Sequence, residues 1–415
     1  MRILWVKAGK LLPVDTGGKI RSYNILRQLA RNLHVTLLSY YGGARDSAYE
    51  AEIQKELPGA YTVHTAALDG SVAAQSFDYL LRLFQSAPFA VSKFTHPDVR
   101  RLVSSWLKEH RFDVAVCDFL SASLNFPDVL DTPTVLFQHN VESILWQRLA
   151  TTESNLAKRV PYRIEAGKMT TYERRALRKF HHVIAVSEND RQQMLKMDPG
   201  CRITVVPTGV DTAKYALAPP STITPPRIVF TGSMDWEPNI DAVVYFCQDV
   251  FPKIRAEFPS AIFQIVGRNP YPRVKHLASD SVEVTGTVPS VADYLRDATV
   301  VVVPLRIGGG TRLKIFEAMA MGKALVSTSI GAEGLDVENG RDVILADDAA
   351  ALADAIILLL RDSALRRQYE QAAAELAAQF DWSNVAQLFA EVLREVLERA
   401  EGRSTSPSQH SAIQP

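Results

Sequence analysis

The sequence is poor in cysteine and has no long apolar segment. Only three of its 415 residues are cysteine, and none lies in a Cys-x-x-Cys motif. This pattern argues against a disulfide-stabilised secreted domain and favours a reducing compartment. No apolar run reaches the length of a membrane span, and charge interrupts the first segment too early for a secretory signal. We therefore expect a cytoplasmic protein, either free or at the inner face of the cell membrane.

Several ligand-binding motifs are also missing. Gly17-Gly18-Lys19 resembles part of a P-loop, but Pro13 stands where the first glycine should be, and Ile20 replaces serine or threonine. No Gly-x-Gly-x-x-Gly follows the first strand of either half, which argues against a nicotinamide dehydrogenase. There is no Asp-x-Asp pair for a metal and no Gly-x-Ser-x-Gly elbow. Basic residues do not alternate with aromatic ones as they do in nucleic-acid-binding proteins.

Length and composition indicate two globular domains. A chain of 415 residues exceeds one ordinary core, and 47% hydrophobic with 22% charged residues is typical of globular proteins. The net charge is zero, yet residues 1–207 carry a surplus of about seven positive charges and the remainder an equal negative surplus. We therefore expect the two halves to meet different partners.

Short apolar runs alternate with amphipathic helical patterns along both halves. This alternation is typical of parallel α/β sheets with helices on both faces. The predicted fold class is therefore α/β, with two doubly wound parallel-sheet domains whose ligands bind at the carboxyl ends of strands. The expected strands are 2–8, 35–41, 61–66, 113–119, 134–139, 183–187, 203–207, 227–231, 261–266, 282–286, 299–305, 324–327 and 342–346.

Proline marks the expected domain boundary. Pro219-Pro220 and Pro225-Pro226 lie close together among serines and threonines, which is typical of a stiff linker. The tail after the last amphipathic pattern is rich in serine, proline and glutamine, which predicts disorder. We expect a first domain at 1–210, a linker at 211–226, a second domain at 227–380, a final helical segment at 381–401 and a disordered tail at 402–415.

The most informative stretch runs from Gly308 to Gly322, between two apolar strands. Its glycines allow a ligand to approach the backbone, and the N-terminus of the following helix offers N–H groups to an anion. Arg312 and Lys314 add positive charge to the first turn, where the helix dipole alone would favour acids. Glu317 is then placed to accept the hydroxyls of a ribose. We predict a diphosphate ligand here; a structural turn with surface charges is the alternative.

The order of these motifs matches a known family. The chain resembles the retaining glycosyltransferases of family four, which have the GT-B fold, and among them the sugar transferases of bacterial exopolysaccharide clusters. The resemblance implies two Rossmann-like domains facing a cleft, with a C-terminal helix that crosses back to the N-terminal domain. The motifs that carry it are Gly17-Gly18, His139 to Glu142, Val186 to Glu188, Val206 to Asp211, Phe230 to Ser233, Val266-Gly267, Gly286 to Val288, Glu317 to Gly322, Ser327 to Leu335 and Asp381-Trp382.

The resemblance also implies roles for individual residues. The C-terminal domain would bind a nucleotide-sugar donor and the N-terminal domain a glycan or lipid-linked acceptor, without metal or other cofactor. His139, Arg312 and Lys314 would be catalytic, and positive charge would stabilise the leaving diphosphate on a front-face path that retains configuration. The donor-binding residues would be Gly232, Ser233, Gly309, Gly310, Thr311 and Glu317, and the acceptor-binding residues Gly17, Gly18 and Lys19.

Two features depart from the family pattern. The family has two glutamates eight residues apart, but here only Glu317 is present, because Gly309 takes the place of the first. The Arg and Lys that commonly follow the first strand of the second domain correspond to Ser233 and Pro238. We expect Arg312 and Lys314 of the glycine-rich stretch to replace that missing pair of cations.

Other functions remain open at this point. A nucleotide-sugar 2-epimerase shares the GT-B shape, and a non-catalytic sugar-nucleotide- or lipid-binding protein of an assembly system is compatible with Gly309. Segment 158–179 is either a solvated helix face or a surface for an anionic membrane. Its eight basic residues are Lys158, Arg159, Arg163, Lys168, Arg174, Arg175, Arg178 and Lys179.

Overall fold

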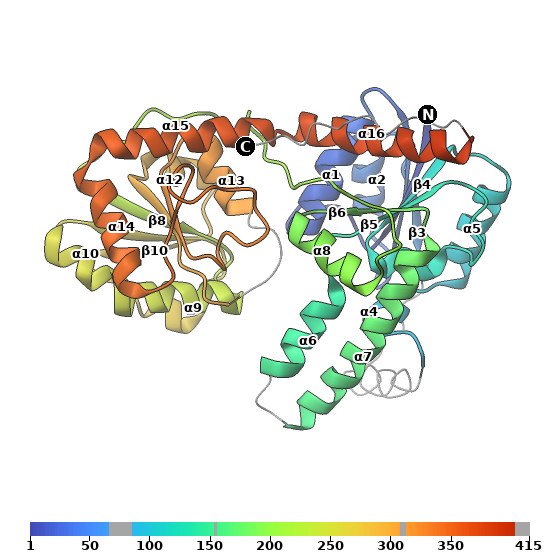
Figure 1. The fold of residues 1–415 in the computed structure, drawn as a ribbon, viewed down its shortest axis with the longest axis horizontal. Helices are drawn as coiled ribbons and strands as arrows, with labels where there is room; N and C mark the ends of the chain where they lie inside the picture. Colours follow the sequence, from blue (N-terminus) through green and yellow to red (C-terminus); the bar gives the residue numbers. More distant parts are fainter. Residues whose placement is uncertain (66–84, 153–155, 308–312, 403–415) are drawn as a thin grey trace. The chain divides into compact units, whose positions relative to one another are not determined.

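The computed structural model describes residues 1–65, 85–152, 156–307 and 313–402. Contacts divide the chain into two compact units. Unit 1 consists of Met1–Pro207 together with Val385–Pro415, and unit 2 of Thr208–Asn384. Each unit is an α/β layer structure built on its own parallel sheet (Figure 1).

Unit 1 contains, in its described part, a seven-stranded parallel sheet with the order β3-β2-β1-β4-β5-β6-β7. The central strand β1 pairs Ile3 with Val35 on one side and with Val114 on the other. Residues Ile3 to Val6 are fully buried, because helices cover both faces of the sheet and a central strand therefore needs a continuous apolar run. The strands are β1 (Arg2–Ala8), β2 (His34–Tyr41), β3 (Tyr61–His64), β4 (Val114–Asp118), β5 (Thr134–Phe137), β6 (His182–Ala185) and β7 (Ile203–Val205).

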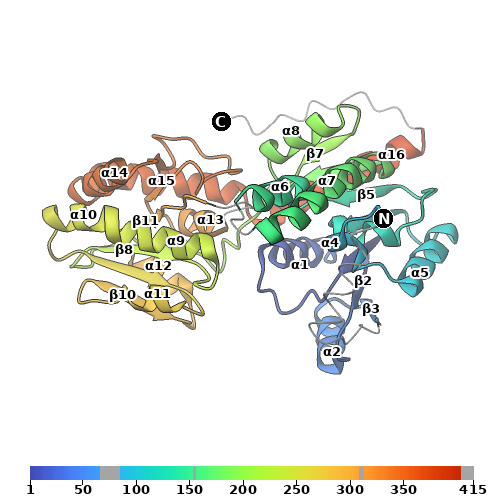
Figure 2. The ribbon, with the colours of Figure 1, turned by 90° about the horizontal axis from the view of Figure 1, so that it is seen from below.

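Helices of unit 1 connect these strands. Helices α6 and α7 pack side by side as an antiparallel pair (Figure 2). Two buried glutamates of α7 accept hydrogen bonds from backbone N–H groups at the starts of other helices: Glu165 from Phe89, and Glu173 from Glu142 and Ser143. The elements are α1 (Gly17–Leu29), α2 (Ser47–Glu56), α4 (Phe89–Ser92), α5 (Pro97–Lys108), the 3-10 helix η1 (Leu120–Asn125), α6 (Glu142–Thr152), α7 (Leu156–Lys179) and α8 (Glu188–Met197).

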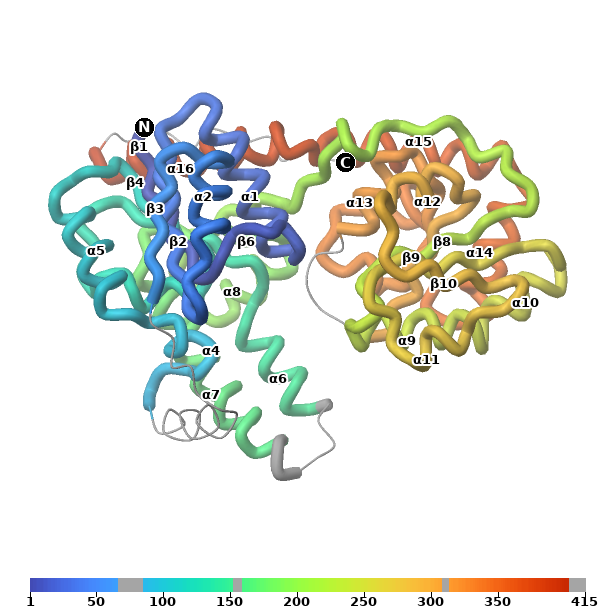
Figure 3. The backbone as a smooth tube through the Cα atoms, turned by 180° about the vertical axis from the view of Figure 1, so that it is seen from behind, coloured from blue at the N-terminus to red at the C-terminus, as the bar shows by residue number. Residues whose placement is uncertain are grey.

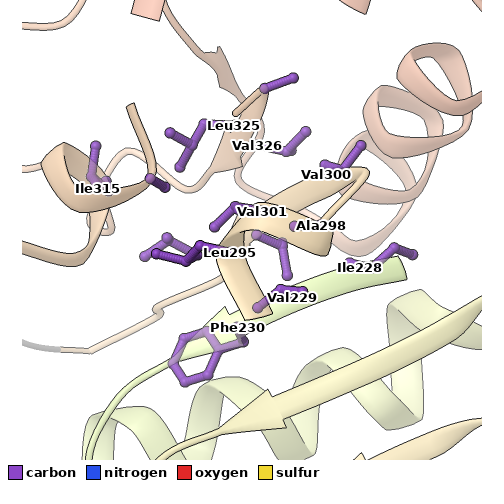
Figure 4. Packing of buried hydrophobic residues seen from close by; sticks show 14 of the residues in the cluster. Ile228, Val229, Phe230, Leu295, Ala298, Val300, Val301, Ile315, Leu325 and Val326 are labelled. Carbon is purple, nitrogen blue, oxygen red and sulfur yellow. The ribbon is translucent and has the colours of Figure 1, made fainter. Parts of the chain in front are cut away.

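Unit 2 contains, among its described residues, a six-stranded parallel sheet with the order β10-β9-β8-β11-β12-β13. Figure 4 shows the core where Phe230 and Val229 of β8 lie near Val301 of β11, Leu295 and Ile315. The strands are β8 (Arg227–Thr231), β9 (Ile262–Val266), β10 (Val282–Gly286), β11 (Val300–Val303), β12 (Leu325–Ser327) and β13 (Ile344–Leu345). The helices are α9 (Glu237–Tyr245), the π-helical η2 (Phe246–Val250), α10 (Phe251–Glu257), α11 (Pro272–Lys275), α12 (Val291–Asp297), α13 (Leu313–Ala320), α14 (Ala349–Arg361) and α15 (Ser363–Gln379).

Each sheet has one point where the strand order reverses. In unit 1 the chain builds outward from β1 to β3 and then returns to place β4 on the other side of β1. In unit 2 the same reversal separates β8 from β11. Because loops diverge to opposite faces at such a point, the carboxyl ends of the two strands leave room for a ligand. The topology therefore marks the ends of β1 and β4, and of β8 and β11, as the places to search for a site.

The final helix α16 (Trp382–Ala400) begins in unit 2 and continues as part of unit 1. At its start, Asp381 accepts a hydrogen bond from the Thr212 hydroxyl at 2.6 Å. Further along, the Phe389 ring lies against Trp5 and Phe137, with centroids 5.2 and 5.1 Å apart. The red α16 and the blue β1 are therefore neighbours in Figure 3. This is the predicted return of the C-terminal helix to the N-terminal unit.

The expected strands all exist, with ends that differ by at most two residues. The independent linker expected at 211–226 is wrong in its first half, because Tyr215 and Ala218 are buried in the core of unit 2. The Ala218 N–H also donates to the carbonyl of Met321 at 3.2 Å. Prolines stiffen this segment, but Tyr215 and Ala218 pack in the core of unit 2, so the segment is not an independent linker.

We predict that Phe389→Ala will lower the free energy of unfolding by about 3–5 kcal/mol, because it leaves a cavity between two buried rings. Arg394→Ala, at an exposed position of the same helix, should change it by less than about 0.5 kcal/mol. Urea titrations followed by circular dichroism measure both values. Equal stability of the two variants would mean that α16 contributes little to the core of unit 1.

Candidate functional site

In unit 2, Lys314 lies at the reversal point of the sheet. Its Nζ lies 4.2 Å from the centroid of the Phe230 ring and donates a hydrogen bond to Asn239 Oδ1 at 2.9 Å. A Cβ atom built on Gly232 would lie 2.9 Å from this nitrogen and 2.8 Å from the Asn239 amide, so a side chain at this position would displace these groups. The ammonium group is therefore held against the backbone that follows β8.

The loops after β8 and β9 are in direct contact at two glycines. A Cβ atom on Gly267 would lie 1.6 Å from the carbonyl oxygen of Gly232, which no side chain could tolerate. Two backbone hydrogen bonds extend this contact: Met234 N–H donates to Arg268 O at 2.8 Å, and Tyr271 N–H donates to Met234 O at 3.1 Å. The peptide groups beside Lys314 are thus fixed from two directions.

Ser233 follows Gly232 and belongs to a polar cluster. Its hydroxyl donates to Asp235 at 2.6 Å and accepts a hydrogen bond from Arg268 Nε at 3.1 Å. The other carboxylate oxygen of Asp235 accepts from the amide of Asn269 at 3.0 Å. The predicted donor-binding residues Gly232 and Ser233 therefore lie between two cations, Lys314 and Arg268.

Glu317 lies one turn after Lys314 on α13 and is half-buried. Burial raises the pKa of its carboxyl group, and a hydrogen bond with Tyr215 together with Lys214 and Lys314 partly offsets that rise. Tyr215 is a buried residue of the unit 2 core. Tyr215 thus hydrogen-bonds a carboxylate that follows Lys314 by one turn of the same helix.

Four predicted site residues cannot be placed. Gly309, Gly310, Thr311 and Arg312 lie outside the described residues. Their roles stay predictions from the sequence.

In unit 1, the reversal point contains a closed network of buried charges. Asp118, at the end of β4, accepts hydrogen bonds from Lys7 at 3.0 Å and from the Trp5 indole at 2.9 Å on one oxygen. His139 Nε2 donates to its other oxygen at 2.7 Å, and Arg21 Nη1 lies 2.9 Å from His139 Nδ1. Burial alone would raise the Asp118 pKa, but Lys7 and His139 outweigh it and hold that pKa well below its usual range.

His139 was expected to contact the donor sugar. Because Arg21 can only donate, His139 Nδ1 must be the acceptor and Nε2 must carry the proton. Burial lowers the His139 pKa to about 4, against the opposing effect of Asp118, so the ring is neutral near pH 7. Both nitrogens therefore have protein partners, and the ring also lies between Phe119 and Phe137.

The predicted acceptor-binding residues lie at the start of α1. Gly18 faces the His139 ring, since a Cβ atom there would lie 3.4 Å from Nδ1. Lys19 turns back on its own loop, where its Nζ lies 3.0 Å from an Asp15 oxygen and donates to the Pro13 carbonyl at 3.2 Å. The structure thus brings Gly18 and His139 together and orients Lys19 toward the loop before the helix; Gly17 is the first residue of α1.

Sequence reasoning missed the partners of the predicted residues. Lys7 is a cation inside an apolar strand and Asp118 ends another, which was a usable signal because buried charges need partners. Asn239 and Arg268 gave no such signal. They matter through the loop contacts described above, which depend on how two separate strands end side by side.

The basic residues of α7 do not form one continuous free surface. Lys168, Arg178 and Lys179 bond within unit 1, whereas Arg163, Arg174 and Arg175 are exposed. In the part of the chain that the structure describes, no helix has the length and apolarity of a membrane span. The same described residues contain no group of three His, Cys, Asp or Glu side chains arranged to hold a metal ion.

Comparisons with known proteins agree with this geometry. The family models for Glycosyltransferase Family 4 and for Glycosyl transferases group 1 match residues 16–214 and 225–362, respectively. Phosphatidyl-myo-inositol mannosyltransferase of Mycolicibacterium smegmatis is 28% identical over 301 residues, which are 70% of this chain and 73% of that protein. The Mycobacterium leprae protein of the same name is 30% identical over 49% of this chain and 56% of its own length.

Solved structures show the same architecture. Anabaena Alr3699/HepE in complex with UDP aligns with a TM-score of 0.66 at 16% identity, over 95% of this chain and 100% of that one. Sucrose-phosphate synthase from Thermosynechococcus elongatus aligns with a TM-score of 0.68 at 16% identity, over 96% and 100%. Two parallel-sheet units of this kind define the GT-B fold. With the two family models, they show that the chain is a glycosyltransferase related to family 4.

We predict that His139 makes unit 1 less stable in acid. Its folded pKa of about 4 lies below the ordinary 6.5, so the unfolded chain binds a proton first and stability falls as pH drops from about 6.5 toward 4. Between pH 7 and pH 5 this effect amounts to about 2 kcal/mol. Asp118 acts in the same direction only below about pH 4.

The measurement is the free energy of unfolding at pH 7 and pH 5 for the wild type and for His139→Gln. The glutamine keeps one donor and one acceptor but cannot titrate. The free energy of unfolding at pH 7 exceeds that at pH 5, and this difference should be about 2 kcal/mol smaller in the variant than in the wild type. An unchanged difference would show that the pKa of the ring is not lowered in the folded protein.

Proposed function

We propose that this glycosyltransferase moves a sugar from a nucleotide-sugar donor to a glycan or lipid-linked acceptor with retention of configuration. The observation that carries the proposal is the position of Lys314, whose ammonium is fixed against Gly232 at the reversal point of the unit 2 sheet. An ammonium between rigid loops is suited to a diphosphate, and Glu317 lies one turn away for the ribose. The UDP in the Anabaena structure and the names of the mannosyltransferase relatives support this assignment.

The chemistry requires stabilisation of the leaving group. As the bond between sugar and diphosphate breaks, negative charge grows on the phosphate oxygens, and a preorganised cation lowers the energy of that state. Lys314 is preorganised by Asn239 and Phe230, and Arg312 is proposed to act with it. The acceptor proton is proposed to pass to a phosphate oxygen on the same face. Since side chains supply the positive charge, we expect turnover without a metal ion.

His139 keeps a proposed role at the donor sugar. Its two nitrogens are bonded to Asp118 and Arg21, so a hydrogen bond to a sugar hydroxyl would replace one of these. The exchange with Arg21 is the simpler one, because a sugar hydroxyl can donate to Nδ1 in its place while the Nε2 bond to Asp118 stays as it is. The Gly17-Gly18-Lys19 start of α1, beside this ring, is the proposed acceptor side.

A transfer assay tests the proposal. Purified protein is incubated with a panel of UDP-, GDP- and ADP-sugars and lipid-linked or oligosaccharide acceptors, with chelator present, and the anomeric configuration of the product is read by NMR. We expect an α-configured donor to give an α-linked product at an undiminished rate. Epimerised donor without transfer would indicate the 2-epimerase, binding without turnover would indicate a non-catalytic protein, and rescue by Mg²⁺ or Mn²⁺ would contradict metal independence.

The same assay addresses membrane contact. We propose that the exposed Arg163, Arg174 and Arg175 favour acceptors presented in an anionic surface, with about 1 kcal/mol from each cation near it. Acceptor in phosphatidylglycerol vesicles should then be used faster than acceptor in neutral vesicles, and salt should remove the difference. Equal rates on both vesicles would leave a transferase without membrane preference.

Lys314 and Glu317 should differ in the part of the donor that they bind. Lys314→Ala should lower the affinity for nucleoside diphosphate by roughly tenfold to a hundredfold, because a charged hydrogen bond contributes about 1.5–3 kcal/mol. The affinity for the nucleoside should be nearly unchanged. Glu317→Ala should lower the affinity for both the nucleoside and the nucleoside diphosphate. Calorimetric titration measures these affinities, and a Lys314→Ala effect of equal size on nucleoside and diphosphate would separate Lys314 from the phosphates.

A further inference from the structure

The missing cation pair of the family leaves a question that the structure addresses. Ser233 and Pro238 stand where an Arg and a Lys are common, so the loop after β8 brings no positive charge of its own. Lys314 reaches Gly232 from α13 and supplies one cation. A second cation contacts the next residue, Ser233.

That second cation is Arg268, in the loop after β9. Its Nε donates to Ser233 Oγ at 3.1 Å, and its backbone carbonyl accepts the Met234 N–H at 2.8 Å. Gly267, the residue before it, touches the Gly232 carbonyl so closely that the two loops cannot separate without losing their packing. Arg268 is therefore placed by a rigid backbone and oriented by a hydrogen bond, although its side chain is exposed.

The hydrogen-bond directions determine which donor groups remain available to bind a ligand. Ser233 gives its only proton to Asp235, so its hydroxyl accepts from Arg268 and cannot also donate to a phosphate. Arg268 uses Nε for this bond. Among the residues that the structure describes, neither Nη group of Arg268 has a hydrogen-bond or ion-pair partner. These two groups present the forked donor pattern that binds phosphate oxygens.

We propose that Arg268 is a second diphosphate-binding residue, which contacts Ser233 while Lys314 contacts the adjacent Gly232. Ser233 and Asn239 are then positioning residues, Ser233 for the guanidinium and Asn239 for the ammonium. Asn239 is buried and spans the loop, since its amide donates to the Ser233 carbonyl at 2.9 Å while its oxygen accepts from Lys314. This inference rests on the proposed donor site and adds to it the cation that the sequence of the β8 loop lacks.

Arg273 offers a matched control. It is an exposed arginine of the same region, on the short helix α11, but its guanidinium pairs with Glu237. Removing its charge changes the net charge of the protein by the same amount as removing that of Arg268. A ligand effect that is specific to Arg268 therefore cannot come from net charge alone.

The experiment measures affinities of wild type, Arg268→Gln, Arg268→Lys, Arg273→Gln and Lys314→Gln by calorimetry. The probes are UDP, GDP and ADP, the matching nucleosides, and inorganic pyrophosphate as a probe without a base. Arg268→Gln should lower the affinity for diphosphate and for pyrophosphate about tenfold to a hundredfold. The affinity for the nucleoside should stay within about twofold of the wild-type value. Arg268→Lys should recover part of the affinity, and Arg273→Gln should resemble the wild type. Matching circular dichroism and melting temperatures show that each variant is folded.

A double-mutant cycle tests the positioning role. Ser233→Ala should lower the affinity for diphosphate less than Arg268→Gln does. Because Ser233 acts through the arginine, the double variant should bind diphosphate only slightly more weakly than Arg268→Gln alone. Independent, additive losses would overturn that role.

The outcomes separate this inference from the proposed function. Wild-type affinity for diphosphate in Arg268→Gln, with loss in Lys314→Gln, would overturn the role of Arg268 and leave the donor site standing. If the wild type bound none of the three diphosphates, and showed no transfer, both proposals would fail together.

Discussion

The central strands of a parallel sheet covered on both faces have apolar interiors and carry charged groups near their ends, and this constraint shapes both units. The interior of β1, and that of β8 or β11, is apolar on both sides because helices pack on each face. Charged residues are consequently displaced toward the carboxyl ends, where loops diverge at the reversal of strand order. The location of the proposed donor site is therefore a consequence of the topology as much as of any single residue.

The two reversal points use buried charge in different ways. In unit 1, Lys7 and Asp118 form an ion pair that is almost completely withdrawn from solvent, and removing either partner would leave a buried charge uncompensated. In unit 2, the Arg268 guanidinium is exposed and bonds to a neutral hydroxyl, which costs little desolvation and keeps charge accessible. The first arrangement stabilises a fold, whereas the second suits an anionic ligand that arrives from water.

Much of this organisation could be predicted from the sequence, because the periodicity of apolar residues survives in the fold. Strands such as 2–8 and 227–231 match to the residue, since a buried strand must be a continuous apolar run with polar ends. Lys314 could be predicted because a basic residue is unusual in the first turn of a helix, and Glu317 because it follows one turn later on the same face. Asn239 and Arg268 could not, because their role depends on contacts with the loop after β8, and Ser233 and Arg268 are 35 positions apart in the chain and meet only after β8 and β9 pair.

The discontinuity of unit 1 has a consequence for synthesis on the ribosome. Trp5 and Phe137 are made early, but the ring that completes their packing belongs to Phe389, near the end of the chain. Unit 2 lies entirely between these segments and is continuous from Thr208 to Asn384. While unit 2 is being translated, the Trp5 and Phe137 rings of unit 1 lack the Phe389 ring that packs on them in the folded protein. The core of unit 1 is therefore completed only after α16 has been synthesised.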